Sequence, residues 1–334
     1  MPYLQLEKMN KVSVIVPIYK VEGFIERCAR SLMEQTLSEV EFIFVDDASP
    51  DRSIEILRRT LTDYPNRQQQ VRILTHEVNK GLPAARNTGL AAATGEYIFH
   101  CDSDDYVERE MLAEMYEAAE KADADIVWSD FWLSFEQNER YMKVRNYATP
   151  QETLNGMLEG AMKYNVWNKL TRRALYSENQ IAFPTGHSMG EDMTMIRLMT
   201  CAKKVAYIPK AYYHYVRLNM SALTQTFSER HLIDIRHNVD ETVAFLRNVL
   251  GTGIEPQLAL FELSIKFPFL ISDKRSDYER WRSWYPEANR YIWQSKELPL
   301  RTKLIQWFAA KGQFWAVWLY YKVVYKFMYG VIYR

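Results

Sequence analysis

Short runs of hydrophobic residues alternate with amphipathic stretches over the first hundred residues. The runs VSVIVPIY at 12–19, VEFIFVDD at 40–47 and VRILTH at 71–76 are mainly apolar and rich in β-branched residues. This pattern is typical of strands that are buried on both faces, as in a parallel sheet. A fourth run, YIFH at 97–100, leads directly into the acidic sequence CDSDDYV.

Helical patterns separate these runs. One lies at about 23–35, one at about 51–62 after an N-cap and first-turn signal at Ser49 and Pro50, and one runs from about Pro83 to Thr94. Strands that alternate with helices predict an α/β fold with a mostly parallel, twisted sheet and helices on both faces.

The pattern is mixed beyond residue 107. We expect a helix at 108–121, a strand at 125–135, a helix opened by the capping box of Thr149 to Glu152, and a β-rich run at 204–217. The second half therefore adds strands to the same kind of layered structure.

From about residue 221 onward the pattern predicts helices and no strand. A boundary is expected near 218–225, where the last β-rich run ends. The predicted organisation is a first domain at 1–218, with halves at about 11–106 and 107–218, followed by a helical C-terminal region at 219–334.

Composition limits the class of protein and its partners. The 334 residues are 48% hydrophobic and 25% charged with zero formal net charge, so the whole molecule has no electrostatic attraction for nucleic acid. Cys28, Cys101 and Cys201 lack metal-binding spacing, which predicts reduced, buried thiols. The polar N-terminus is unlike a signal peptide, and no uncharged apolar run reaches the ~18 residues of a spanning helix. We expect a cytoplasmic protein that is soluble or peripheral to a membrane.

Carboxylates gather where two of the predicted strands end. Asp46 and Asp47 end the second strand, and Asp102 and Asp104 follow the fourth. Ligands of open α/β sheets bind beyond the carboxyl ends of the strands, so these side chains predict a site. The spacing Asp102-Ser103-Asp104 offers hard oxygen donors that suit Mg²⁺ or Mn²⁺, although taken alone it also fits a solvated turn. Neither a GxGxxG loop nor a P-loop follows the first strand.

Four motifs together resemble a family 2 glycosyltransferase of the GT-A fold, of the bacterial cell-surface polysaccharide type. They are VSVIVPIYKVEGFIERCARSLMEQT, EFIFVDDASPDRS, NKGLPAARNTGLAAATGEYIFHCDSDDYV and the later GED, and the similarity covers about 11–217. The resemblance implies a Rossmann-like nucleotide-binding half at about 11–106 and an acceptor half at 107–218. The chain departs from the family at Lys20, where asparagine is frequent, and at Ala48, where glycine is frequent.

The resemblance implies a set of contacts to a nucleotide-sugar donor, most simply a UDP-sugar. Pro17 and Tyr19 correspond to a loop that wraps the base. Asp47 corresponds to the aspartate that accepts a hydrogen bond from the uracil ring, a suitable role for a carboxylate. Arg86 corresponds to an arginine that faces the nucleotide, while the competing interpretation is an arginine on a helix surface.

The same resemblance implies a metal site for Mn²⁺ or Mg²⁺. Asp102 corresponds to the contact with ribose and metal, and Asp104 to the direct metal ligand. His214, near the end of the last β-rich run, corresponds to a histidine that completes the metal shell in several GT-A enzymes, although a lone histidine is more often a hydrogen-bonded core residue. Asp105 is interpreted as a helix cap, because a helix is expected from Tyr106 onward.

The catalytic base is expected in the GED motif at 190–192. The resemblance makes Asp192 the base that takes the proton of the acceptor hydroxyl as it attacks the anomeric carbon, which gives an inverting transfer. The alternative is that Glu191 and Asp192 only stabilise a helix N-terminus electrostatically. Trp167, in VWNKL, resembles a motif beside the acceptor site, and an ordinary core tryptophan is the competing interpretation.

The C-terminal tail at about 300–334 is basic and aromatic. From Pro299 to Arg334 it has six basic residues, eleven aromatic residues and no acidic residue. As a helix it would place Lys311, Lys322 and Lys326 on one face, beside Trp315 and Trp318. The opposite face would be apolar, with Ala316, Val317, Tyr320, Val324, Phe327 and Val331.

We predict that this tail rests on the inner face of the cytoplasmic membrane near lipid-linked acceptors, because interfacial tryptophans and snorkelling lysines suit that position. In the alternative, its apolar face packs back on the catalytic domain. The predicted function is transfer of a sugar to a hydroxyl of a glycan or lipid-linked acceptor. The rival functions are a nucleotidyltransferase of related fold and a catalytically inactive glycan-binding or scaffold protein.

Overall fold

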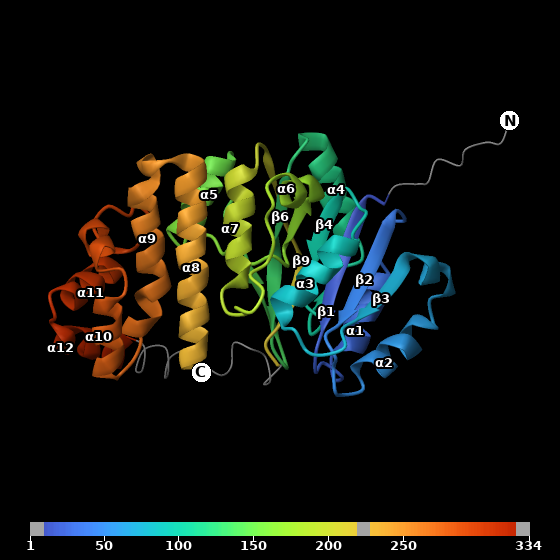
Figure 1. Cartoon of the computed structure of the whole chain (residues 1–334), viewed down its shortest axis with the longest axis horizontal. Helices are drawn as coiled ribbons and strands as arrows, with labels where there is room; N and C mark the ends of the chain where they lie inside the picture. The colour runs from blue at the N-terminus through green and yellow to red at the C-terminus, as the bar shows by residue number, and fades with distance from the viewer. Residues whose placement is uncertain (1–9, 219–227, 325–334) are drawn as a thin grey trace. The chain divides into compact units, whose positions relative to one another are not determined.

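The computed structural model describes residues 10–218 and 228–324 (Figure 1). The chain divides into two compact units, which are described separately below. The sheet unit comprises Met1–Gln151 and Tyr164–Thr242, and the helical unit comprises Glu152–Lys163 and Val243–Arg334. The predicted boundaries near residues 106 and 218 stay predictions.

Within the described residues, the sheet unit contains a nine-stranded sheet of order β3-β2-β1-β4-β8-β6-β9-β5, with β7 paired to β6. The strands are β1 (Val12–Ile18), β2 (Val40–Asp46), β3 (Val71–Thr75), β4 (Tyr97–His100), β5 (Tyr106–Val107), β6 (Ile126–Ser134), β7 (Glu139–Met142), β8 (Lys169–Arg172) and β9 (Val205–Val216). Strands β1 to β4 are mutually parallel, and β8 is antiparallel to both β4 and β6, so β6 and the parallel β9 point in the same direction as β1. The predicted mostly parallel sheet is confirmed.

The helices of the sheet unit cover both faces of this sheet, because apolar side chains along β1 point alternately to one face and the other. Val12, Val14 and Val16 belong to a core shared with the helices α1 and α4. Ile15 points to the opposite face, because a Cβ built on Gly89 of α3 would lie 2.4 Å from its Cγ2 atom. Successive side chains of a strand point to opposite faces, so a continuous apolar run needs helices on both sides.

The helices of the described chain include counterparts of those predicted at about 23–35, 51–62, 83–94 and 108–121. Those that begin in the sheet unit are α1 (Ile25–Met33), α2 (Ser53–Leu61), α3 (Leu82–Ala92), α4 (Met111–Ala122), α6 (Arg173–Glu178), α7 (Thr194–Cys201) and α8 (Glu229–Leu250). Helix α5 (Pro150–Leu158) starts two residues before the helical unit, which also holds α9 (Glu255–Lys266), α10 (Arg275–Ser283), α11 (Leu300–Ala310) and α12 (Phe314–Tyr320).

The cap predicted at Ser49 and Pro50 for the second helix is wrong. Helix α2 begins at Ser53, because Asp51 accepts hydrogen bonds from both the backbone N–H and the hydroxyl of Ser53 at 3.1 and 2.6 Å. Ser49 instead accepts a bond from the backbone N–H of Lys20 at 2.8 Å. Asp51 also accepts a bond from the N–H of Glu22 at 3.0 Å, so the loops after β1 and β2 are fixed to each other.

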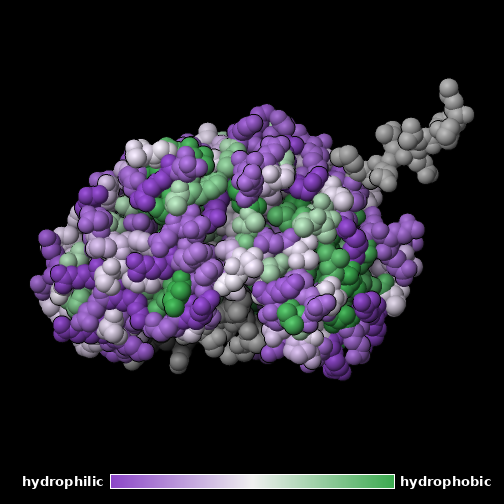
Figure 2. Space-filling view, viewed as in Figure 1, coloured by the Kyte–Doolittle hydropathy of each residue, from purple (hydrophilic) through white to green (hydrophobic). Residues whose placement is uncertain are grey.

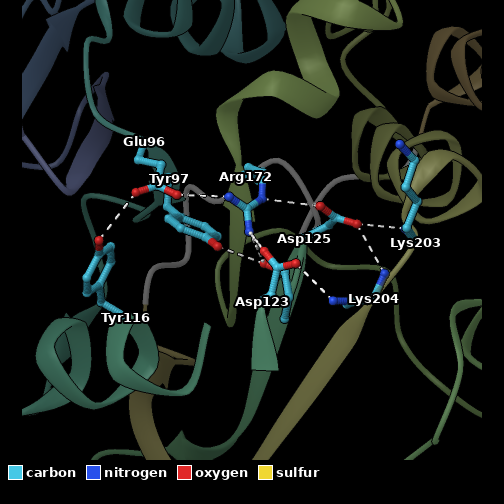
Figure 3. A network of polar contacts seen from close by, with 9 residues as sticks. Glu96, Tyr97, Tyr116, Asp123, Asp125, Arg172, Lys203 and Lys204 are labelled. Atoms are coloured by element: carbon cyan, nitrogen blue, oxygen red, sulfur yellow. Dashed lines mark hydrogen bonds and ion pairs between the residues drawn. The ribbon is translucent and has the colours of Figure 1, made fainter. Parts of the chain in front are cut away.

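A cluster of ion pairs closes the edge of the sheet where β4, β6 and β9 begin (Figure 3). Arg172 at the end of β8 lies 2.9 Å from Glu96, 3.1 Å from Asp123 and 3.2 Å from Asp125. Asp123 also pairs with Lys204 at 2.9 Å. These contacts join the starts of three strands at the edge opposite the predicted site.

The helical unit has its own apolar core. Leu263, Trp281, Ala309 and Val317 are almost completely buried in it. The ammonium group of Lys266 is buried beside them and donates hydrogen bonds to the carbonyl oxygens of Trp284 and Tyr285 and to Asn289 Oδ1. A lysine can be buried in this way because each of its three N–H groups has an acceptor.

The surface in the view of Figure 2 is mostly hydrophilic, with hydrophobic residues gathered near β2 and β3. Within the described residues, β3 is the last strand at that edge of the sheet, and most of its side chains are half-buried. No helix of residues 10–218 and 228–324 is both long and apolar enough to cross a membrane.

Two loop positions carry strained backbones. Lys20 and Ala48, which follow β1 and β2, both have φ of 55°. This left-handed conformation costs an L-residue about 1–2 kcal/mol, and glycine and asparagine tolerate it best. The two departures from the family pattern therefore stand at positions where the more frequent family residues would relieve strain.

We expect Ala48→Gly to raise the free energy of unfolding by about 0.5–1 kcal/mol, since relief of the left-handed strain exceeds the entropy that glycine adds to the unfolded chain. Urea unfolding measures this change. Ala91→Gly, on an exposed position of α3, is the matched control and should lower the stability by about 1 kcal/mol. Destabilisation by both substitutions would contradict the assigned strain.

Candidate active site

The carboxyl ends of β1, β2 and β4 meet at one edge of the sheet, as predicted. Strand β1 pairs with β2 on one side and with β4 on the other, in parallel register. The residues that follow these strands, from Tyr19, Asp47 and Cys101 onward, therefore start from the same edge. Tyr19 is exposed with the Lys20 ammonium 5.2 Å from its ring centre, and Pro17 is buried within β1.

Asp47 holds the loop that leads into α3. Its Oδ1 atom accepts hydrogen bonds from His76 Nδ1 at 2.7 Å and from the N–H of Lys80 at 2.8 Å, and its Oδ2 atom accepts one from the N–H of Gly81 at 2.8 Å. The residue is buried. A contact of Asp47 with a base stays a prediction, and the structure gives this carboxylate a local role as well.

Arg86 of α3 lies inside the sheet unit rather than on a helix surface. Only 1% of it is exposed, which excludes the surface interpretation. Its Nη2 atom donates to Asp102 Oδ1 at 2.9 Å, whereas its buried Nε and Nη1 atoms have no hydrogen-bond partner within the described chain. Buried donors without partners are costly, and a bound ligand is one way to satisfy them.

The prediction that Asp105 caps a helix is wrong. Residues 106–107 form β5 and α4 begins at Met111. Asp105 is buried and accepts hydrogen bonds from the Tyr213 hydroxyl and from the N–H of Val216, both at 2.7 Å. The Tyr213 hydroxyl in turn accepts a bond from the N–H of Asp102 at 3.0 Å, so Asp105 and Tyr213 fix the backbone that carries the DxD sequence.

Three acidic side chains, those of Asp102, Asp104 and Asp105, follow strand β4. Burial raises the pKa of Asp105 well above its usual range, and the neighbouring Asp104 and Asp102 carboxylates raise it further. No group of three or more His, Cys, Asp or Glu side chains in residues 10–218 and 228–324 is arranged to hold a metal ion. Mg²⁺ in phosphate-binding sites commonly takes only one or two carboxylates together with substrate phosphates, so Asp102 and Asp104 fit such an ion.

The GED motif lies next to these groups. Gly190 has a φ of 85° and precedes the short helical turn Glu191–Met193, which continues into α7. Asp192 has a buried Oδ1 atom without a partner within the described chain. Burial raises the pKa of Asp192, the nearby Asp102 carboxylate raises it further, and the charges of Arg86 and Lys169 oppose this rise. The charges of Arg86 and Asp102 are thus close enough to Asp192 to affect its pKa.

Two charged residues of this site were not assigned from the sequence. Burial raises the pKa of Glu191, and the Asp192 charge adds to this effect. Lys169 is buried, donates to Asn165 O at 2.7 Å and to Asn168 Oδ1 at 2.9 Å, and has its pKa lowered by burial to about 7, against the opposing effect of Asp192. The only sequence signal for Lys169 is a lysine at the start of a short, otherwise unremarkable strand.

Trp167 lies among aromatic side chains of the core. It is 8% exposed, with ring centres of Tyr213, Phe131 and Tyr215 at 4.6, 4.8 and 5.2 Å. This packing accounts for the residue as a core tryptophan, the interpretation that competed from the start. Stacking on an acceptor sugar stays a prediction that would use the small exposed part of the ring.

His214 of β9 has both ring nitrogens engaged. Nδ1 lies 2.7 Å from Glu139 Oε1 and Nε2 lies 3.0 Å from Glu108 Oε1, and the ring stacks on Tyr106. A role of His214 as a metal ligand stays a prediction and would require one of these contacts to break.

Side chains of helix α8 hold the loop that leads into the GED motif by hydrogen bonds and ring stacking. Asn238 Nδ2 donates to the carbonyl oxygens of Met189 at 2.8 Å and of His187 at 3.2 Å. Asp234 lies 3.2 Å from His187 Nδ1, and the rings of His187 and His237 stack at 3.8 Å. Residues 234, 237 and 238 share one helix face, so a single face of α8 fixes the backbone before Glu191 and Asp192.

Residues 13–194 match the sequence profile of the family described as glycosyl transferase family 2. This segment is more than half of the chain and contains all four motifs except Val12, the first residue of the first motif. The chain belongs to glycosyl transferase family 2. The profile ends two residues after Asp192, so the α8 contacts come from a part of this family 2 chain that the profile does not cover.

The family 2 chain is also similar to individual known proteins. It is 36% identical over 222 residues to the uncharacterized glycosyltransferase EpsJ of Bacillus subtilis, a match that covers 64% of this chain and 63% of that relative, less than two thirds of its length. The structure of S. aureus TarS 1–349 with UDP-GlcNAc superposes with a TM-score of 0.72 at 21% identity and covers 93% of this chain and 91% of TarS 1–349.

A second solved structure is more distant. The mannosyltransferase PcManGT of Pyrobaculum calidifontis, solved with GDP-Man and Mn²⁺, has a TM-score of 0.56 at 17% identity, covering 94% of this chain and 84% of PcManGT. Likeness at these identities shows the fold alone. It confirms the predicted GT-A fold with a helical C-terminal region.

Proposed function

We propose that this protein transfers a sugar from a nucleotide-diphosphate donor, most simply a UDP-sugar, to a hydroxyl of a cell-surface glycan or lipid-linked acceptor. The observation that carries the proposal is the grouping of the buried Arg86, the Asp102 carboxylate and the unpartnered Asp192 oxygen at the carboxyl edge of the sheet. Family membership and the solved complexes of TarS and PcManGT with nucleotide sugars support the donor class.

Each charged group has one task in this proposal. Asp192 takes the proton of the acceptor hydroxyl while the hydroxyl oxygen attacks the anomeric carbon. The bond between that carbon and the diphosphate oxygen breaks, and the configuration at the carbon inverts. Arg86 offers its unpartnered donors to the diphosphate, where they compensate negative charge. Pro17, Tyr19 and Asp47 line the base end, and Trp167 contributes to the acceptor side.

Asp104 and Asp102 would hold a divalent ion, Mg²⁺ or Mn²⁺, with His214 as a further predicted ligand. When bound, such an ion stabilises the charge of the departing diphosphate. The hard oxygen donors of Asp102 and Asp104, two residues apart after β4, support this assignment. The protein would work in the cytoplasm at the inner membrane face.

Thermal shift and turnover with a panel of nucleotide sugars, with and without Mn²⁺, test the proposal. We expect Asp104→Ala to lose the metal-dependent part of donor binding, because it removes the direct ligand. Turnover assays with nucleoside triphosphates and sugar phosphates as substrates test the rival nucleotidyltransferase function. Donor binding without turnover of any donor would favour the inactive scaffold and would contradict the proposal.

The hydrogen bonds between Asn238 of α8 and the loop before the GED motif lead to a separate prediction. We expect Asn238→Ala to lower kcat about 10–100-fold and to leave the donor KM unchanged, because the hydrogen bonds of Asn238 Nδ2 go to the loop before Asp192. Steady-state kinetics separate the two constants. Arg236→Ala, at an exposed position of α8, is the control and should leave both unchanged. A rise in KM without loss of kcat would contradict the positioning role.

A further inference from the structure

Helices α11 and α12 of the helical unit expose large apolar side chains to solvent. On α11 these residues follow at spacings of four and three, which places them on one helix face. On α12 the most exposed is Trp315, with 65% of the residue accessible. We call this set the aromatic face; its members are Leu300, Leu304, Trp307, Trp315, Trp318 and Leu319.

The two helices form one continuous surface. The Phe308 ring lies 5.2 Å from Trp307 on α11 and 6.4 Å from Trp315 on α12. The tryptophans of both helices therefore surround one partly buried phenylalanine. A contiguous exposed apolar surface of this kind usually marks an interaction site.

This surface differs from the one that the sequence predicted for the tail. Ala316 and Val317 are buried and Tyr320 packs against the core of the helical unit, so these three members of the predicted apolar face point inward. The predicted members Phe327 and Val331 lie outside the described residues. An isolated helix pattern cannot distinguish a face that binds a membrane from one that packs on neighbouring helices, because both are apolar.

The charges around the aromatic face are basic. Between Pro299 and Val324 the sequence has four basic residues and no acidic one. Lys303 donates to Ser295 O at 2.5 Å, and Lys322 pairs with Asp273 at 3.5 Å. Arg301 and Lys311 are exposed, and Lys311 continues the Leu300–Leu304–Trp307 stripe by one more turn.

We propose that the aromatic face docks on an anionic lipid surface, with its tryptophans at the headgroup level and Arg301 and Lys311 against lipid phosphates. A second copy of the chain is a poorer occupant, because a symmetric contact through this face would bring the same positive charges together. Tryptophan beside basic residues suits the interface, where aromatic rings meet the acyl boundary and basic side chains reach the headgroups. This docking deepens the proposed membrane position and does not depend on the transfer activity.

Flotation of the full-length protein with vesicles of phosphatidylglycerol and phosphatidylcholine tests this inference. We expect Trp315→Ser/Trp318→Ser to lower the vesicle partition coefficient at least about tenfold, because two large apolar contacts are lost. We expect Arg301→Glu/Lys311→Glu to lower binding to these vesicles, and salt to do the same in the wild type. Deletion of the tail is less suitable, since α11 and α12 contribute Ala309 and Val317 to the core.

Phe135→Ser is the matched control, because Phe135 is a similarly exposed aromatic residue of the sheet unit at 43%, against 46% for Trp318. It should float like the wild type. Unchanged flotation of the tryptophan double variant, or no flotation of the wild type with anionic vesicles, would overturn the inference. A tryptophan variant that changes oligomeric state in sedimentation and leaves flotation unchanged would assign the face to a second copy instead. Retained donor turnover in the double variant separates this test from that of the proposed function.

Discussion

Asp192→Asn is expected to lower kcat for sugar transfer by about 10²–10⁴-fold while donor binding is retained, because the substitution removes a general base and keeps the shape of the side chain. Stopped assays of acceptor glycosylation measure kcat, and calorimetric titration with the nucleotide sugar measures binding. Asp240→Asn, at an exposed position of α8, is the matched control and should behave as the wild type. Near-normal transfer by Asp192→Asn would show that another group accepts the proton.

The pH profile gives a second measurement of the same assignment. Burial raises the pKa of Asp192 above the usual range of an aspartate, so its carboxylate takes up a proton at a higher pH than an exposed aspartate would. Because only the ionised form can act as the base, kcat should fall as the pH decreases through this raised pKa. The residual activity of Asp192→Asn should lack this fall.

Arg86→Met should weaken donor binding by about ten- to a hundredfold, since hydrogen bonds to charged groups contribute about 1.5–3 kcal/mol each. Two buried donor atoms of Arg86 have no partner within the described residues, and the proposed function assigns them to the diphosphate. Titration with the free nucleoside diphosphate measures the affinity. Arg52→Met, at an exposed ion pair with Glu22, is the matched control and should bind normally.

The same variant should move the acid limb of kcat to higher pH. The positive charge of Arg86 lowers the pKa values of both Asp192 and Glu191, so its removal lets both rise further. Arg86→Lys keeps the charge and should keep the limb near its wild-type position. Unchanged affinity together with an unchanged pH profile in Arg86→Met would remove Arg86 from the site.

The strands and helices of the first hundred residues could be predicted because β1, β2 and β4 are buried on both faces and their sequences are correspondingly apolar. Strands β5, β7 and β8 were missed, because they have two to four residues and carry polar side chains such as Lys169 and Glu139. Pairing with longer strands, rather than their own composition, makes them strands. The cap assigned to Asp105 failed for the same reason, since β9 binds the residues that would otherwise start the helix.

The sequence by itself determined the fold class, the family and the edge of the sheet where Asp47, Asp102 and Asp104 lie, because these depend on local periodicity and on the order of motifs along the chain. Only the tertiary structure decided which charges meet. Three interactions join separate segments of the chain. Arg86 is buried against Asp102, the charge of Lys169 acts on Asp192, and Asn238 donates hydrogen bonds to the loop before the GED motif. Desolvation and charge coupling depend on distance in space, and no local pattern records them. The same holds for the tail. Its composition predicted a membrane interface, but the packing of α11 and α12 on the helical unit determines which of their side chains stay exposed.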